Sequence, residues 1–191
     1  KQITPQQETF AGYPVPLTGG DNRTLTNVSY NDIAGNLFEN DIIKLGEKSI
    51  TTGYPDGGFH PLESIERGAM AAYLYRLAGS PEFEAPAESP FSDVPTTHPF
   101  YKEIAWLKAT GITTGWEDGT FRPEDSINRE AMAAFFYRAA GSPEVQQKAT
   151  FTDVSGSPFA KEISWFQFSK LSTGWPDSTF RPHDSVKRDA M

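Results

Sequence analysis

Apolar residues recur along this chain at helical spacing, in short segments separated by turn-rich loops. One kind of segment has apolar residues at positions i, i+4 and i+7, a spacing that predicts an amphipathic helix burying one face. It occurs three times, with the anchors Phe38, Ile42 and Leu45, then Phe100, Ile104 and Leu107, then Phe159, Ile163 and Phe166. Trp106 and Trp165 in these segments, with Lys44 at the matching place, are interpreted as packing residues.

A second kind of helix follows in the first two copies. Met132, Phe135, Phe136 and Ala139 share one helical face, and Gly141-Ser142-Pro143 ends the segment. The earlier copy has Met70, Tyr73, Leu74 and Leu77 in the same register. The pattern therefore predicts a mainly α fold built from repeated helix, loop, helix units.

The repeat period is about 60 residues, as read from Met70, Met132 and Met191. Each copy opens with an aromatic-x-Asp-aliphatic signature at Tyr30, Phe91 or Phe151. We predict an irregular arm or linker over 1–29 and modules over 30–90, 91–150 and 151–191. The third module has only the beginning of its second helix, which would leave a three-module core one helix short.

The loop between the two helices has the same order in every copy. A Gly and an aromatic residue lead into Pro-Asp-Gly, Glu-Asp-Gly or Pro-Asp-Ser, which is turn chemistry, and a Phe and a second Pro follow. Ser64, Ser126 and Ser185 come next and are the predicted N-caps of the second helices.

The net charge and the lack of cysteine exclude several classes of function. The net charge is −8, which argues against general binding of nucleic acid or anionic membranes. The absence of cysteine excludes disulfides, thiol catalysis and cysteine metal sites. No apolar run is long enough to span a membrane, and the first residue is Lys1, so a processed or excised fragment is the simplest interpretation.

These motifs resemble the S-layer homology (SLH) family of bacterial cell-surface proteins. The resemblance rests on Phe-x-Asp-Val, Phe-Tyr-Lys-Glu-Ile, Gly-Ile-Thr-Thr-Gly-Trp, Asp-Gly-Thr-Phe-Arg-Pro and Arg-Glu-Ala-Met-Ala-Ala-Phe-Phe-Tyr-Arg, and it covers residues 30–191. It implies a pseudo-threefold, three-pronged helical unit. It also implies non-covalent attachment of an exported protein to cell-wall polysaccharide, often a pyruvylated polymer, in grooves between modules.

The chain departs from the family signature Thr-Arg-Ala-Glu at the start of the second helix. The three copies read Glu66-Arg67-Gly68-Ala69, Asn128-Arg129-Glu130-Ala131 and Lys187-Arg188-Asp189-Ala190. The Arg is present three times, whereas the Thr and the Glu are absent three times. The departure bears on the identity of the polymer more than on an anchoring role.

The repeated arginines are the leading binding candidates on charge grounds. With Ser126 as N-cap, Arg129 stands in the first turn of a helix, where a cation costs about 0.3–1 kcal/mol unless an anion compensates it. An anionic sugar substituent held by the guanidinium and free helix N–H groups is one source of that charge. The alternative is an internal ion pair with Asp32, Asp93 or Asp153, or with the loop residues Asp56, Asp118 or Asp177.

Aromatic residues add a second candidate feature. Tyr54, Trp116 and Trp175 follow the turn Gly of each module, where a ring can stack on a pyranose face or simply cover the loop as core. The loops have too few alternating oxygen ligands for a calcium site. His60, His98 and His183 do not align with one another and are interpreted as solvent-exposed loop residues, and carboxylates that recur once per module do not suggest a catalytic pair.

Three hypotheses remain open at this stage. The first is a non-catalytic, extracellular anchor with ligand residues Arg67, Arg129, Arg188, Asp32, Asp93, Asp153, Tyr54, Trp116 and Trp175, and with no cofactor or metal. The second is a structural or protein-interaction module of a surface layer or appendage, in which the arginines form internal salt bridges and an unclosed core invites a partner chain. The third is the targeting part of an extracellular hydrolase.

Overall fold

The computed structural model describes residues 9–10, 13–14 and 28–191. Five α-helices dominate these residues: α1 (Glu39–Glu47), α2 (Arg67–Leu77), α3 (Tyr101–Ala109), α4 (Arg129–Ala139) and α5 (Ala160–Phe168). A 3-10 turn, η1, covers Arg188–Ala190. The predicted mainly α fold is confirmed.

A small antiparallel sheet lies in the region predicted as an irregular arm. Strand β1 (Thr9–Phe10) pairs with β2 (Tyr13–Pro14), with Thr9 opposite Pro14. The prediction of irregular backbone is wrong for these four residues. The rest of the predicted arm up to residue 27 lies outside the described residues.

The first helix of each module forms where the apolar spacing predicts it. Helices α1, α3 and α5 begin directly after Phe38, Phe100 and Phe159, and the middle anchor of each helix is fully buried. A polar side chain two residues earlier accepts the backbone N–H of each Phe. These side chains are Asn36, His98 and Ser157.

The helices pack in pairs that join neighbouring modules. Helix α2 of the first module packs on α3 of the second, and α4 of the second packs on α5 of the third. The edge of Tyr75 meets the ring of Trp106 at a centroid distance of 5.3 Å, and Tyr137 meets Trp165 in the same way at 5.7 Å. Trp106 is completely buried, so its predicted packing role is confirmed.

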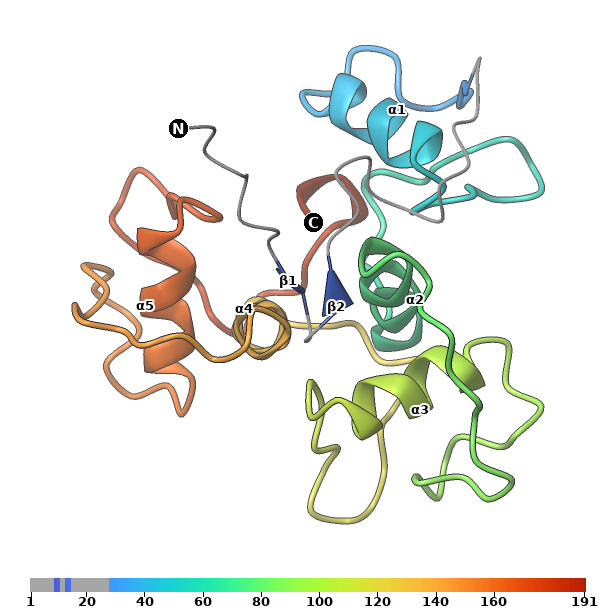
Figure 1. Cartoon of the computed structure of the whole chain (residues 1–191). Coiled ribbons are helices and arrows are strands. Elements are labelled where there is room, and N and C mark those ends of the chain that lie inside the picture. Colours follow the sequence, from blue (N-terminus) through green and yellow to red (C-terminus); the bar gives the residue numbers. More distant parts are fainter. Residues whose placement is uncertain (1–8, 11–12, 15–27) are drawn as a thin grey trace, which may run out of the picture.

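A cyclic set of backbone hydrogen bonds joins the three modules at their centre. The N–H of Ile65 donates to Val186 at 2.9 Å, that of Val186 donates to Ile127 at 3.0 Å, and that of Ile127 donates to Ile65 at 2.9 Å. All three side chains are buried. Figure 1 shows α1, α3 and α5 as three separate lobes, with α2 and α4 nearer the middle.

This ring explains why the predicted helix starts are wrong. The segments with Ser64, Ser126 and Ser185 are extended and form bridges to neighbouring modules, so the serines cannot act as N-caps. The helices begin two residues later, with Glu66 and Asn128 as the N-caps of α2 and α4. The repeated Arg is therefore the first helical residue, and only Asn128 caps its helix with a side chain, accepting the N–H of Ala131.

Candidate functional site

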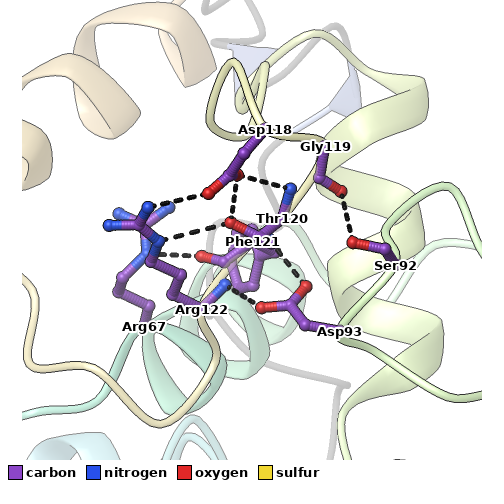
Figure 2. Close-up of polar contacts among 8 residues, drawn as sticks. All are labelled: Arg67, Ser92, Asp93, Asp118, Gly119, Thr120, Phe121 and Arg122. Carbon is purple, nitrogen blue, oxygen red and sulfur yellow. Dashed lines mark hydrogen bonds and ion pairs between the residues drawn. The ribbon is translucent and has the colours of Figure 1, made fainter.

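The aspartate that opens each module holds the loop in front of the second helix. One carboxylate oxygen of Asp93 accepts the N–H of Phe121 at 2.8 Å, and the other accepts the N–H of Arg122 at 2.7 Å (Figure 2). Asp32 binds the N–H groups of Phe59 and His60 in the same way, and Asp153 binds those of Phe180 and Arg181. Both oxygens of each aspartate are thus engaged by backbone.

These bonds hold one residue per loop in the left-handed backbone conformation. Arg122 has φ 60°, and His60 and Arg181 have the equivalent values of 58° and 56°. A non-glycine residue there costs about 1–2 kcal/mol, so the surrounding contacts must impose the conformation. Asp93 supplies those contacts by accepting the N–H groups of two successive residues, Phe121 and Arg122.

The loop arginines are neutralised within their own loops. Arg122 donates to Asp118 at 2.9 Å, and Asp118 also accepts from Thr120 (Figure 2). Hydrogen bonds from Thr120 and Arg122 lower the pKa of Asp118 to about 2. Arg181 and Asp177 form the same pair at 3.1 Å.

The helix arginines reach across to the next module. The Nε of Arg67 donates to the carbonyl of Phe121 at 2.8 Å, and its guanidinium carbon lies 4.8 Å from the centre of that Phe ring (Figure 2). Arg129 makes the same contact with Phe180, and Arg188 makes it with Phe59, 129 residues away in sequence. Each aspartate therefore positions the Phe whose carbonyl positions a helix arginine.

No carboxylate of the described residues pairs with these helix arginines. Within the described ranges, no carboxylate oxygen of Asp or Glu lies within 4.0 Å, the limit for an ion pair, of a side-chain nitrogen of Arg67, Arg129 or Arg188. Arg67 and Arg188 are 7% and 5% exposed, and Arg129 is partly buried. Burial lowers the pKa of Arg67 to about 10 and also lowers that of Arg129, yet both remain charged at neutral pH. The predicted internal ion pairs with Asp32, Asp93, Asp153 and the loop aspartates are absent from this part of the chain.

The first helix N–H groups are not available to a ligand, contrary to the sequence-based expectation. The backbone N–H of Arg67 donates to the backbone carbonyl of Asp125, and that of Gly68 donates to the carbonyl of Pro123, both across the module boundary. Arg129 and Arg188 begin their helical segments with the same type of bond. The helix termini are therefore closed to a ligand, whereas the side chain of Arg67 borders a cavity.

The repeated aromatic residues stand at the surface beside these arginines. Tyr54, Trp116 and Trp175 are 40%, 46% and 44% exposed, so the interpretation that they cover the loop as core is wrong. The guanidinium groups of Arg122 and Arg181 each stack 4.1 Å above their Trp, and the ring of His60 stacks on Tyr54 at 4.2 Å. His60 stands at the place in its repeat that Arg122 and Arg181 have in theirs, and the structure shows that this position supports the aromatic ring.

The histidines do not share one environment. His183 is exposed, as expected, whereas His98 is largely buried and His60 is half-buried, so the interpretation of all three as exposed loop residues is wrong. His60 binds Asp56 at 2.8 Å and Glu63 at 3.1 Å. The hydrogen bond to Asp56, followed by that to Glu63, raises the pKa of His60 above its ordinary value of 6.5.

A cavity of about 380 Å³ adjoins Arg67. Its wall combines residues of all three modules, including Trp116, Phe135 and Pro158. Four charged residues line it: Arg67, Asp125, Glu130 and Arg138. Glu130 already accepts from Ser157 at 2.6 Å and pairs with His183. The other three charged residues of the wall have no ion pair among the residues described, and of these Arg67 is the buried one.

Three repeated modules, joined cyclically through their backbone and through inter-module arginines, define a tandem-repeat protein. The chain belongs to the S-layer homology domain family, which matches residues 29–71, 90–133 and 150–191. The expectation drawn from the repeated motifs is thus confirmed.

Curated relatives place this family among proteins of the bacterial cell surface. The chain is 33% identical over 148 residues to Cell surface glycoprotein 1 of Acetivibrio thermocellus, covering 71% of this chain and 6% of the relative. It is 32% identical over 143 residues to a cellulosome-anchoring protein of the same species (71% and 32%) and over 155 residues to an endoglucanase of a Bacillus species (76% and 16%). The chain spans less than a third of the length of each of these relatives.

The described residues contain neither a membrane-spanning helix nor a cluster of metal-ligating side chains. No helix there has the length and apolar character needed to cross a bilayer. No group of three or more His, Asp or Glu side chains there is arranged to hold a metal ion.

Proposed function

We propose that this chain is a non-catalytic, extracellular module that binds an anionic cell-wall polysaccharide in its inter-module grooves. The observation that carries the proposal is the buried guanidinium of Arg67, which borders a cavity and has no carboxylate within ion-pair distance in the described part of the chain. A buried cation is costly unless an anion compensates it. A carboxylate on the polymer would supply that charge and accept paired N–H groups.

The other features that recur in each repeat fit a saccharide. The guanidinium carbon of Arg67 lies 5.8 Å from the centre of the Trp116 ring, and nearly half of the Trp116 surface is exposed. An exposed ring next to a charged donor can stack on a pyranose face while the donor binds an acidic substituent. In this proposal Asp32, Asp93 and Asp153 position the arginines through the loop backbone, and Tyr54, Trp116 and Trp175 form the walls.

Binding to purified cell wall tests the proposal. Arg67, Arg129 and Arg188 are each changed to Gln, which removes the charge and keeps a side-chain donor, and Lys102→Gln is the control because it removes the same charge from an exposed position. Retention of the protein in the pellet should fall for at least one Arg variant and stay at the wild-type level for the control. Equal retention of all four variants and the wild type refutes the proposal.

The endoglucanase relative suggests how such a module is used in a longer protein. In that relative the matched region is a small part of the chain. We propose that the present chain likewise serves as the targeting part of a larger surface protein, whose own activity lies elsewhere. Fusion of residues 1–191 to a reporter enzyme should bring the reporter to the wall, whereas a fusion that stays in solution argues against a targeting role.

A further inference from the structure

The three helix arginines have different hydrogen-bond partners for their terminal nitrogens. Arg188 donates from a terminal nitrogen to the hydroxyl of Tyr73 at 2.9 Å, and Arg129 donates to the hydroxyl of Ser172 at 3.3 Å. In the described structure, neither terminal nitrogen of Arg67 donates a hydrogen bond. The three grooves are therefore chemically different although the repeat makes them look alike.

One side chain accounts for the difference between the Arg67 and Arg188 grooves. Tyr73 in α2 and Phe135 in α4 occupy the same place in the repeat, three residues after the helical Met. The guanidinium carbon of Arg188 lies 5.8 Å from the Tyr73 ring centre, and that of Arg67 lies 5.5 Å from the Phe135 ring centre. The rings are placed alike, but only Tyr73 carries a hydroxyl.

The Tyr73 hydroxyl connects two polar groups. It accepts from Arg188 and lies 3.0 Å from the hydroxyl of Thr51, so it has a proton to donate to that oxygen. In the other groove the residue equivalent to Thr51 is Thr113, which is 3% exposed and lines the cavity. Thr113 accepts the N–H of Gly115, and no acceptor for its own proton is found among the described residues. Two donors thus face the space that a tyrosine oxygen fills in the neighbouring groove.

We infer that the cavity beside Arg67 is the principal anion site of the chain, and that a ligand carboxylate oxygen takes the place that the Tyr73 hydroxyl oxygen has beside Arg188. Phe135 is the residue that keeps this place open. The inference rests on the proposed function and adds to it: binding is concentrated in one groove, and the identity of one aromatic residue decides which groove it is.

The charge environment supports this assignment. Only 7% of the Arg67 surface is exposed, and the resulting desolvation is the main cause of its lowered pKa. Asp125 is the first of the acids that counteract this effect, but it lies beyond ion-pair distance. A carboxylate bound at the terminal nitrogens would satisfy the guanidinium and the Thr113 hydroxyl together.

A pair of reciprocal substitutions tests the inference without removing any charge. Phe135→Tyr adds the hydroxyl to the Arg67 groove, and Tyr73→Phe removes it from the Arg188 groove. The probe is a methyl hexopyranoside carrying a pyruvyl ketal, and the same compound with its carboxylate esterified shows how much of the binding depends on charge. Isothermal titration on the whole chain gives the affinity and the number of sites.

We expect Phe135→Tyr to weaken carboxylate binding about tenfold, since the new hydroxyl competes for a hydrogen bond to a charged group worth about 1.4 kcal/mol. Tyr73→Phe should leave this site unchanged and add a second binding event. Both variants are checked for folding by thermal unfolding, because Tyr73 also bonds to Thr51. The esterified compound should bind neither site.

The possible results separate the inference from the function it rests on. If Phe135→Tyr binds as well as the wild type while Arg67→Gln abolishes binding, the groove binds anions but Phe135 does not control it, and the inference is wrong. If Arg67→Gln, Arg129→Gln and Arg188→Gln each lower the affinity equally, the grooves are equivalent and the inference is also wrong. If none of the three has an effect, the proposed function itself fails.

Discussion

Replacement of Asp93 by Ala tests whether one carboxylate organises both the loop and the groove. The change removes two hydrogen bonds, from the N–H groups of Phe121 and Arg122, at 2.8 Å and 2.7 Å. A hydrogen bond to a charged acceptor contributes about 1.5–3 kcal/mol, and one partly buried carboxylate shared by two donors should contribute about 2–4 kcal/mol in all. For a chain of this size, that loss corresponds to a fall in Tm of about 4–15 °C.

Urea and thermal unfolding followed by circular dichroism measure this loss. Ser92→Ala is the matched control, since Ser92 precedes Asp93 in the same segment and its hydroxyl makes only an exposed bond of 3.4 Å to the Gly119 carbonyl. The control should change the free energy of unfolding by less than about 0.5 kcal/mol. Asp93→Ala should also weaken wall binding, because the Phe121 carbonyl that holds Arg67 loses its own support. A loss of stability no larger than that of the control refutes the role assigned to Asp93.

Three other predictions follow from single contacts. Gly115→Ala should cost about 2–4 kcal/mol, because its φ is 76° and the new Cβ would meet an aromatic carbon at 2.4 Å, whereas Gly119→Ala, at φ 79° with nothing within 4 Å, should cost only about 1 kcal/mol. Asn128→Ala should lower stability by about 1 kcal/mol through loss of the α4 cap, while Glu66→Ala, which removes no cap bond, should have almost no effect in the same urea titration. His60 should stabilise the protein at pH values below 6.5 and lose this contribution as the pH rises through its raised pKa, so Tm should fall between pH 5.5 and 8 by more in the wild type than in His60→Ala.

Each of these predictions has a result that contradicts it. Equal costs for alanine at Gly115 and Gly119 would mean that the loop yields to the new methyl group. An unchanged stability of Asn128→Ala would show that the α4 terminus is held by its bonds to the next module alone. A Tm difference between the two pH values that persists in His60→Ala would assign the pH dependence to other groups.

The sequence was sufficient to predict the positions of the helices and to recognise the family, because both depend on local patterns. The i, i+4, i+7 anchors placed α1, α3 and α5, since a helix with one apolar stripe needs only a surface to cover it. The repeated arginine marked the position of the candidate site. The serines misled because a residue with N-cap chemistry also suits an extended segment, and hydrogen bonds to another module decided between them.

What the chain determined by itself was the repeat, the helical faces and one cation per module at the start of the second helix. Only the tertiary structure decided which residues meet across the module boundaries, because those contacts join positions more than 50 residues apart, such as Arg67 with Phe121 and Arg188 with Phe59. The difference between Tyr73 and Phe135 is visible in the sequence, but the sequence does not show that each ring meets an arginine. Folding brings each ring to an arginine from another module. A terminal nitrogen of Arg188 then donates to the Tyr73 hydroxyl, whereas Arg67 borders a cavity beside Phe135.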